Sequence, residues 1–245
     1  MLYAQALSCE MFLNKGWFIG FEKLILYGDL TVSDDNFKPL KTGTTIVGLR
    51  YKGGVILAAD MRTTMGHHIH SGEARKIFFI NDNLALSWAG SVSMNQQLVK
   101  YLRSELKIIK LRTNRDPLVI EAASMMRNWL YGSIRRPSMM QDISSFMFAG
   151  KDARGVHLHY CGADGTKMEI DKYIVDGSGM MYAYGVFESS FKENLEEKEA
   201  IDLAVRAVDA AMQRDVSSGN GVRVVVVNET GANEVLTKSI NTRVQ

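Results

Sequence analysis

The sequence predicts an α+β fold in which two antiparallel β-sheets stack face to face and a pair of helices covers each sheet, giving four layers in the order αββα. The first reason is the order of the expected elements, because strands, two helices, strands, two helices and strands follow in blocks rather than as alternating βαβ units. Short turns between neighbouring strands are the second reason. The third is apolar runs such as residues 55–59, which suit strands buried on both faces.

Two hairpins are expected at the start of the predicted sheets. Each consists of two runs rich in β-branched and apolar side chains, separated by a short turn. The strands of the first hairpin cover residues 44–50 and 54–60, and those of the second cover 76–80 and 84–89.

Two helices are expected next. Ser93 and Gln96 have the spacing of a capping box, and apolar residues then recur at helical intervals to about residue 109. Asp116 and Pro117 offer a cap and a first-turn proline for a second helix that continues to about residue 130.

The second half of the chain repeats this order. Strands are expected at about 144–150, 155–161 and 167–175. Helical patterns follow at about 179–191 and 197–214, and the last strands are expected at 222–227 and near 234–240.

Composition and charge narrow the class of protein. The 245 residues include 46% hydrophobic and 23% charged side chains, which is ordinary for a globular chain and sufficient for one domain. The formal net charge of +2 gives no general attraction to nucleic acid or to anionic membranes. We therefore expect neither nucleic acid nor a membrane among the partners.

The cellular location is expected to be cytoplasmic. The apolar stretch at residues 17–21 is far shorter than the roughly 20 residues of a membrane span. It has neither the positive segment before it nor the small-residue cleavage site after it that a secretory signal requires. The two cysteines, Cys9 and Cys161, form no disulfide framework or metal motif and fit a reducing compartment.

The region from Gly43 to Gly90 combines residue types that suit nucleophilic catalysis. Thr44 opens a strand directly after a glycine, and Asp60 ends the next strand. Lys76 opens the third strand, and Gly90 closes the fourth. Singly, a strand-opening threonine and an Asp–Lys pair are more often structural than catalytic. The interpretation therefore depends on their joint spacing, because pairing of these strands would bring the four residues to one edge of the sheets.

The chemistry of such a group follows from the weakness of a threonine hydroxyl as a nucleophile, because the hydroxyl needs a base. If the chain is cut before Thr44, the freed α-amine, with a reference pKa of about 7.7–8.0, supplies that base. A nearby Lys76 ammonium would lower the pKa of the amine further, and Asp60 would hold Lys76 charged and in place. The backbone N–H of Gly90 would face the oxyanion of the tetrahedral intermediate. These residues predict a peptidase that frees Thr44 as its own N-terminus.

Longer motifs carry a resemblance to a known family. They lie at residues 44–48, 53–66, 76–77, 88–91, 177–179, 182–186 and 214–219. Over about residues 44–230, and in this order, they resemble the β-type subunits of the proteasome core particle. The resemblance implies the N-terminal-nucleophile hydrolase form of the αββα sandwich. It also implies threonine-type endopeptidase activity on unfolded proteins.

The resemblance implies the roles of seven residues. One is the nucleophile, two tune its base, one donates to the oxyanion, and three hydrogen-bond around the nucleophile. In that order they are Thr44, then Asp60 and Lys76, then Gly90, and last Ser178, Asp215 and Ser218. The presence of all seven argues against a catalytically inactive β-type subunit.

The resemblance also divides the chain. Residues 1–43 correspond to a propeptide that autolysis removes between Gly43 and Thr44, and residues 44–245 correspond to the catalytic domain. Until the cut, the nitrogen of Thr44 is acylated and cannot act as a base. This propeptide is longer than that of the simplest archaeal-type subunits.

A substrate pocket is also implied by the resemblance. Its lining residues carry no charge, and they are Thr63, Thr64, Ala74, Phe78, Trp88 and Val92. A charged substrate side chain would lose hydration there without gaining a partner, so cleavage is expected mainly after apolar residues. Trp88 is bulkier than the residue usual at its position, so it is expected to leave room for leucine but not for a large aromatic ring.

The partners implied are those of a ring-shaped protease. They are identical or related β-type subunits, α-type subunits in outer rings, an ATPase that unfolds substrates, and unfolded polypeptides. Peptide hydrolysis of this kind needs no cofactor and no metal.

Three alternatives remain. A bacterial two-ring threonine peptidase also begins with paired threonines, but the motifs around Ser178 and Asp215 and the long propeptide favour the proteasome type. A structural α-type ring subunit would need a helical N-terminal extension with an aromatic and acidic signature. An N-terminal-nucleophile amidase acting on small molecules would not form rings that hide its site.

Two further patterns are interpreted as structural. His67, His68 and His70 lack a cysteine or a second acidic ligand at matching spacing, so a turn or loop is expected there rather than a metal site. Four methionines at helical positions are expected to fill the core, namely Met125, Met126, Met180 and Met181.

Overall fold

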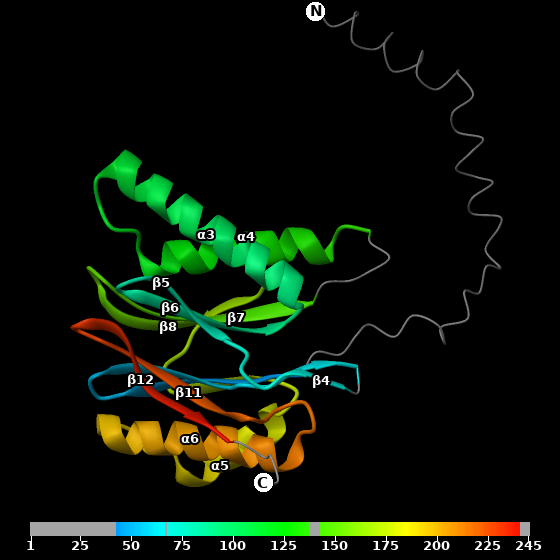
Figure 1. Ribbon diagram of the computed structural model, residues 1–245. Coiled ribbons are helices and arrows are strands. Elements are labelled where there is room, and N and C mark those ends of the chain that lie inside the picture. Colours follow the sequence, from blue (N-terminus) through cyan, green and yellow to red (C-terminus); the bar gives the residue numbers. More distant parts are fainter. Residues whose placement is uncertain (1–42, 67, 138–142, 241–245) are drawn as a thin grey trace, which may run out of the picture. The chain divides into compact units, whose positions relative to one another are not determined.

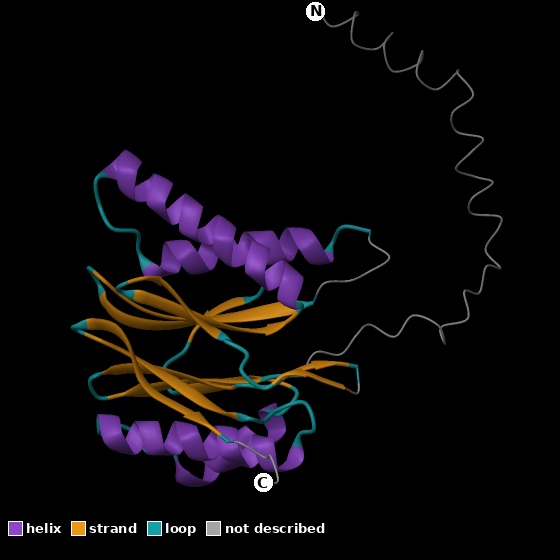
Figure 2. Cartoon of the chain, in the orientation of Figure 1, coloured by secondary structure: helices purple, strands orange, loops and turns teal. Residues whose placement is uncertain are grey.

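A computed structural model describes residues 43–66, 68–137 and 143–240, all within one compact unit, Pro39–Gln245. This unit consists of four layers, two stacked sheets between two pairs of helices (Figures 1 and 2). The predicted αββα sandwich is therefore confirmed.

The first sheet has five antiparallel strands in the order β10-β1-β2-β11-β12. Their bounds are Thr45–Tyr51 for β1, Gly54–Asp60 for β2, Tyr173–Gly177 for β10, Gly221–Asn228 for β11 and Gly231–Ser239 for β12. Because β1 pairs with both β2 and β10, its first residues lie beside the ends of those two strands. This register places the residues that precede β1 next to the residues that follow β2 and β10.

The second sheet has five strands in simple sequence order, from β5 to β9. They are β5 Ile77–Asn81, β6 Leu84–Gly90, β7 Ser144–Asp152, β8 Gly155–Cys161 and β9 Lys167–Glu169. A separate two-stranded ribbon pairs β3, Thr63–Met65, with β4, His68–Ser71.

The helices cover the outer faces of the two sheets (Figure 1). Helices α3, Val92–Thr113, and α4, Val119–Ile134, lie over the second sheet. Helices α5, Met180–Ser190, and α6, Glu197–Arg214, lie over the first. Within the described ranges, no helix is both long enough and apolar enough to cross a membrane.

The core is divided into three apolar layers. On β1, Ile46 packs between the two sheets, whereas Val47 and Leu49 pack against α5 and α6. Successive side chains of a strand point to opposite faces, so a strand buried on both faces must be apolar at nearly every position. This is the physical reason for the continuous apolar runs that predicted the sandwich.

Both predicted helix caps were wrong. Helix α3 begins at Val92, one residue before Ser93, because the backbone of Ser91 is the N-cap and its carbonyl accepts the N–H of Asn95 at 3.0 Å. Helix α4 begins after Leu118, whose N–H donates to the carboxylate of Glu121 at 2.8 Å. The cap comes from inside the helix rather than from Asp116, because Glu121 reaches back to an otherwise unpaired N–H.

The prediction of a single strand at 167–175 was also wrong, because two strands, β9 and β10, lie there. The chain leaves β9 in the second sheet and enters β10 in the first sheet, with the exposed Asp171 and Lys172 in the crossing. The histidine segment differs as well, since His68 and His70 lie in strand β4 rather than in a loop, while His67 lies outside the described residues.

The methionines divide into two groups. Met126 is fully buried and Met125 packs against the core beneath α4, as expected. Met180 and Met181 are 40% and 72% exposed on α5, so their prediction as core filler was wrong. Both lie in the first turn of α5, whose buried side chains are Ala183 and Phe187.

Candidate active site

Thr44 lies immediately before β1 and is 5% exposed. The strand pairing brings it close to two segments that are distant in the sequence. Thr45 pairs with Gly177 of β10, so Ser178 follows directly beside Thr44. On the other side, Ile46 pairs with Ala59 of β2, so Asp60 lies beside the start of β1.

Asp60 is buried and accepts four hydrogen bonds. Its Oδ1 accepts from Lys76 Nζ at 2.6 Å and from the N–H of Thr45 at 2.9 Å. Its Oδ2 accepts from the N–H of Arg62 at 2.9 Å and from that of Gly219 at 3.0 Å. These four contacts fix the position of the carboxylate at the end of β2.

Lys76 is the partner of Asp60 in a buried ion pair, with side-chain exposures of 1% for Lys76 and 0% for Asp60. Burial lowers the pKa of the Lys76 ammonium, and the Asp60 carboxylate acts in the opposite direction. Lys76 precedes β5 of the second sheet whereas Asp60 ends β2 of the first, so the pair joins the two sheets. Buried ion pairs are costly to desolvate, and strongly perturbed ones are common at functional sites.

A second polar group lies on the other side of Thr44. Asp215 caps α6, and its Oδ2 accepts from Ser178 Oγ at 2.5 Å and from Ser218 Oγ at 2.6 Å. Ser178 Oγ in turn accepts from the N–H of Thr44 at 3.2 Å. The carboxylate therefore orients the hydroxyl that contacts the nitrogen of Thr44.

Thr45 joins the two polar groups and was not among the predicted site residues. Its N–H donates to Asp60, and its Oγ1 lies 2.7 Å from Ser218 Oγ. Thr45 is fully buried on the same strand face as Val47 and Leu49. A polar residue at an inward position of a strand was the signal that could have found it.

Gly43 and Gly90, which the sequence predicts to belong to the site, are restricted by space or by backbone conformation. A Cβ on Gly43 would lie 1.6 Å from Cβ of Ser217, and the N–H of Gly43 donates to Thr64 Oγ1 at 3.1 Å. Gly90 ends β6 with φ +114°, and a Cβ there would lie 2.1 Å from the carbonyl oxygen of Ile143. Neither position accepts a larger residue without a shift of the backbone.

The six residues predicted to line a substrate pocket occupy two places. Thr63 and Thr64 lie on β3, and the N–H of Ala74 donates to the carbonyl of Met61 at 2.9 Å, so these three belong to the segment that follows Asp60. Phe78 of β5 and Trp88 of β6 stack with ring centroids 4.2 Å apart and an interplanar angle of 27°.

The stacked pair belongs to the core beneath α3. Trp88 is 5% exposed and packs in the same cluster as Leu98 and Leu102, and Phe78 packs against that cluster. Val92, the first residue of α3, is half-buried. The large side chain at position 88 is therefore held by core packing.

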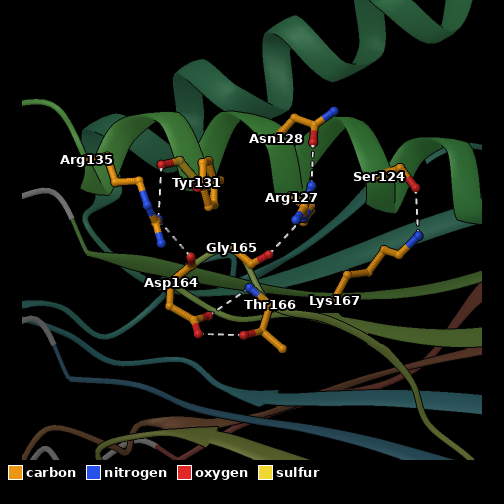
Figure 3. A pocket seen from close by; sticks show the side chains of 9 residues that line it. All are labelled: Ser124, Arg127, Asn128, Tyr131, Arg135, Asp164, Gly165, Thr166 and Lys167. Atoms are coloured by element: carbon orange, nitrogen blue, oxygen red, sulfur yellow. Dashed lines mark hydrogen bonds between the residues drawn. The ribbon is translucent and has the colours of Figure 1, made fainter.

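A cavity of about 520 Å³ lies elsewhere, between α4 and the turn that enters β9 (Figure 3). Its polar side chains are bonded to neighbours, since Arg127 donates to the carbonyl of Gly165 at 3.0 Å and Lys167 donates to Ser124 at 2.8 Å. It shares no residue with the network around Thr44. We therefore assign the candidate chemistry to the Thr44 network and not to this cavity.

Comparison with known proteins identifies the family. A family model described as "Proteasome subunit" matches residues 40–227. A protein named "Proteasome subunit beta" from Methanocorpusculum labreanum is 39% identical over 190 residues, covering 78% of this chain and 88% of its own. A protein of the same name from Methanosarcina barkeri is 37% identical over 195 residues, covering 80% and 90%. These matches confirm the resemblance seen in the sequence, and the chain belongs to the proteasome subunit family.

Proposed function

We propose that the chain is a threonine endopeptidase subunit of a proteasome core, with Thr44 as nucleophile. The observation that carries the proposal is the position of Thr44. Its nitrogen contacts the Ser178–Asp215 pair, and the next residue contacts the buried Asp60–Lys76 pair. The relatives named "Proteasome subunit beta" favour this function over an α-type subunit or a small-molecule amidase.

The proposed base is the α-amine of Thr44 after the chain is cut. Ser178 Oγ would keep its contact with this nitrogen, while Asp215 fixes the direction of the serine hydroxyl. The Lys76 charge would lower the pKa of the amine, so that a larger fraction is neutral and able to take the proton from the Thr44 hydroxyl. Gly90 is proposed as the donor to the oxyanion because it ends β6 in a conformation that favours glycine.

The proposed cut lies between Gly43 and Thr44. The close approach of Gly43 to Ser217 leaves no room for a side chain before the scissile bond. Attack of the Thr44 hydroxyl on the Gly43 carbonyl would form an ester as the C–N bond breaks, which frees the amine of Thr44, and water would then hydrolyse the ester to release the carboxylate of Gly43 and regenerate the Thr44 hydroxyl. Residues 1–43 are proposed to act as the propeptide that delays this step.

The proposed assembly follows the family. We infer rings of β-type subunits, outer rings of α-type subunits and an ATPase that delivers unfolded polypeptides, with no cofactor or metal in the hydrolysis. The uncharged residues assigned to the pocket support cleavage mainly after apolar side chains.

Intact mass and N-terminal sequencing of the assembled protein test the proposal. The wild-type subunit should begin at Thr44 and hydrolyse fluorogenic peptides. Thr44→Ala should assemble but remain uncut and inactive, because it lacks the attacking hydroxyl. Thr42→Ala, which leaves both residues of the junction in place, is the matched control and should be cut as in the wild type. A mature N-terminus other than Thr44, or turnover by Thr44→Ala, would contradict the proposal.

A further inference from the structure

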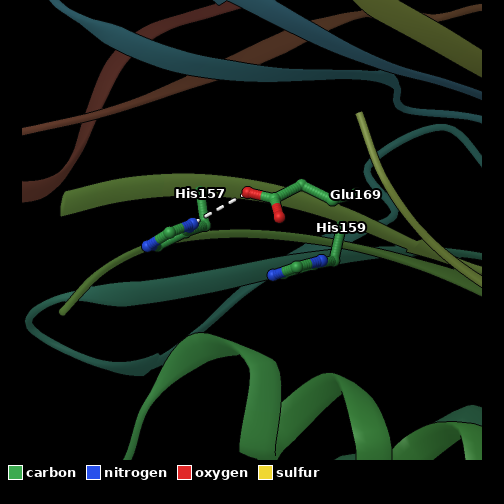
Figure 4. Close-up of side chains that lie close together, drawn as sticks. All are labelled: His157, His159 and Glu169. Atoms are coloured by element: carbon green, nitrogen blue, oxygen red, sulfur yellow. Dashed lines mark hydrogen bonds and ion pairs between the residues drawn. The ribbon is translucent and has the colours of Figure 1, made fainter. Parts of the chain in front are cut away.

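Two histidines and a glutamate gather on one face of the second sheet, on β8 and β9 (Figure 4). His157 and His159 are two residues apart on β8, so their side chains point to the same face. Glu169, the last residue of β9, pairs directly with His159 in the antiparallel register. The strand pairing therefore holds three potential metal ligands together.

The distances between the ligand atoms suit a small metal site. One ligand atom from each of the three residues lies within 4.8 Å of the others. His157 Nδ1 is 2.9 Å from Glu169 Oε1, and the two imidazole rings are nearly parallel, with centroids 5.9 Å apart. Ligand atoms of a tetrahedral zinc ion are about 3.3 Å apart. Side-chain rotations that move each ligand atom by about 1 Å would therefore bring the three atoms to the spacing that zinc requires.

His159 provides independent support because its polar atoms are buried without partners. The residue is 2% exposed, and in the described part of the chain neither ring nitrogen has a hydrogen-bond partner. Native proteins rarely bury such atoms unpaired, and a bound ion is one recognised reason for such an arrangement. A ring that offers a lone pair toward a second imidazole and a carboxylate has the arrangement of a ligand.

Asp152 extends this arrangement by one contact. Its Oδ1 lies 3.5 Å from Nε2 of His157, a nitrogen that has no hydrogen-bond partner among the described residues, and its side chain is 3% exposed. Metal-bound histidines commonly place their second ring nitrogen against a carboxylate, which fixes the tautomer. A metal bound at Nδ1 of His157 would take the place of the proton in its 2.9 Å contact with Glu169, and the ring proton would then lie on Nε2, which faces Asp152.

We propose that His157, His159 and Glu169 bind a divalent cation of the zinc class, with Asp152 orienting His157. Two imidazoles and one carboxylate select zinc, cobalt or nickel over calcium and magnesium, which prefer oxygen ligands. Arg50 is a competing charge, because its guanidinium lies 3.5 Å from Glu169 Oε1. The ion would clamp the short edge strand β9 to β8, so its expected effect is on stability rather than on peptide hydrolysis.

Zinc titration of the metal-free full chain tests the proposal, with isothermal titration calorimetry and thermal unfolding as readouts. The wild type should bind one zinc per chain and unfold at a higher temperature when zinc is present. Glu169→Gln keeps the shape of an exposed side chain and should weaken zinc binding by at least about 10-fold. His157→Gln should do the same, while Glu193→Gln, at an exposed glutamate of another ion pair, should bind as the wild type does.

Cobalt supplies the coordination readout. Cobalt bound to the wild type should give the intense visible absorption of a tetrahedral site, and Glu169→Gln should lose it. The exposed His68 and His70 are the rival ligands, so the double variant His68→Gln/His70→Gln should retain zinc binding. Loss of binding in that double variant, unchanged binding in Glu169→Gln and His157→Gln, or no zinc bound by the wild type would overturn the proposal.

Discussion

The network around Thr44 and the aromatic pair Phe78–Trp88 differ in how each is held. In the network, every named side chain is fixed by hydrogen bonds to specific atoms, and Asp60 alone accepts four. The aromatic pair is held by stacking and by apolar packing beneath α3. Directional contacts allow little substitution, whereas apolar packing tolerates changes of similar volume. We therefore expect changes in the network to affect catalysis, and changes in the pair to affect stability and specificity.

Removal of the Lys76 ammonium should have the largest effect. Lys76→Ala should lower peptide hydrolysis by about 10²- to 10⁴-fold, because the proposed base loses the charge that lowers its pKa. Asp60 keeps three backbone N–H donors, so the fold should survive. Lys76→Arg should restore little activity, since a planar guanidinium does not replace a compact ammonium.

Steady-state kinetics with circular dichroism would check this prediction. Lys172→Ala is the matched control because Lys172 forms an exposed ion pair with Glu193 and should retain full activity. Near-normal turnover by a Lys76→Ala protein already cut before Thr44 would contradict the assigned role of Lys76.

Truncation of Trp88 should have the next largest effect. Trp88→Ala should lower the free energy of unfolding by about 3–5 kcal/mol, because it leaves a cavity against Phe78 beneath α3. On the proposed pocket, the same change should shift cleavage toward tyrosine and phenylalanine. Denaturant unfolding and fluorogenic peptides that differ only in the residue before the cut would measure the two effects.

The assignment of the pocket is tested by the cleavage specificity of the wild-type protein. Fastest cleavage after arginine or glutamate would show that these residues do not form the pocket. Tyr101→Ala is a suitable control, because Tyr101 is half exposed on α3 and its loss should cost less stability than that of Trp88.

Removal of the solvent-accessible ion pair between Arg115 and Glu121 should have the smallest effect on the free energy of unfolding. It provides a reference for the buried Asp60–Lys76 pair. The Arg115 guanidinium lowers the pKa of Glu121 from 4.5 to about 2. The folded state therefore holds its proton less tightly than the unfolded state, so this stabilisation is present above pH 4.5 and is lost as pH falls toward 2. Because solvent screens the pair, Glu121→Gln should cost less than about 1 kcal/mol at pH 7.

Urea unfolding at pH 7 and at lower pH would test the sign. The difference between wild type and Glu121→Gln should shrink as the pH falls below 4.5. A difference that grows at acidic pH would contradict the assigned ion pair.

The sequence predicted those parts of the molecule that depend on local pattern. Apolar runs and block order predicted the sandwich, and the strand ends at Asp60 and Lys76 were assigned within one residue of their observed bounds. Thr45 was missed because its importance depends on contacts with Asp60 and Ser218, which only the folded chain brings to it. The crossing at 170–172 was missed because only pairing with two different sheets separates β9 from β10. The His157–His159–Glu169 group was missed for the same reason, since Glu169 joins it only through strand pairing.

On the proposed mechanism, the ion pair between Asp60 and Lys76 makes activity conditional on correct folding. One charge is carried by the first sheet and the other by the second, so the pair forms only when the two sheets are stacked in register. A chain with either sheet displaced would leave Thr44 without the neighbouring charge that its proposed base requires. A partly folded subunit would therefore not cleave the proteins around it, and the protease would become active only when its two sheets have packed together.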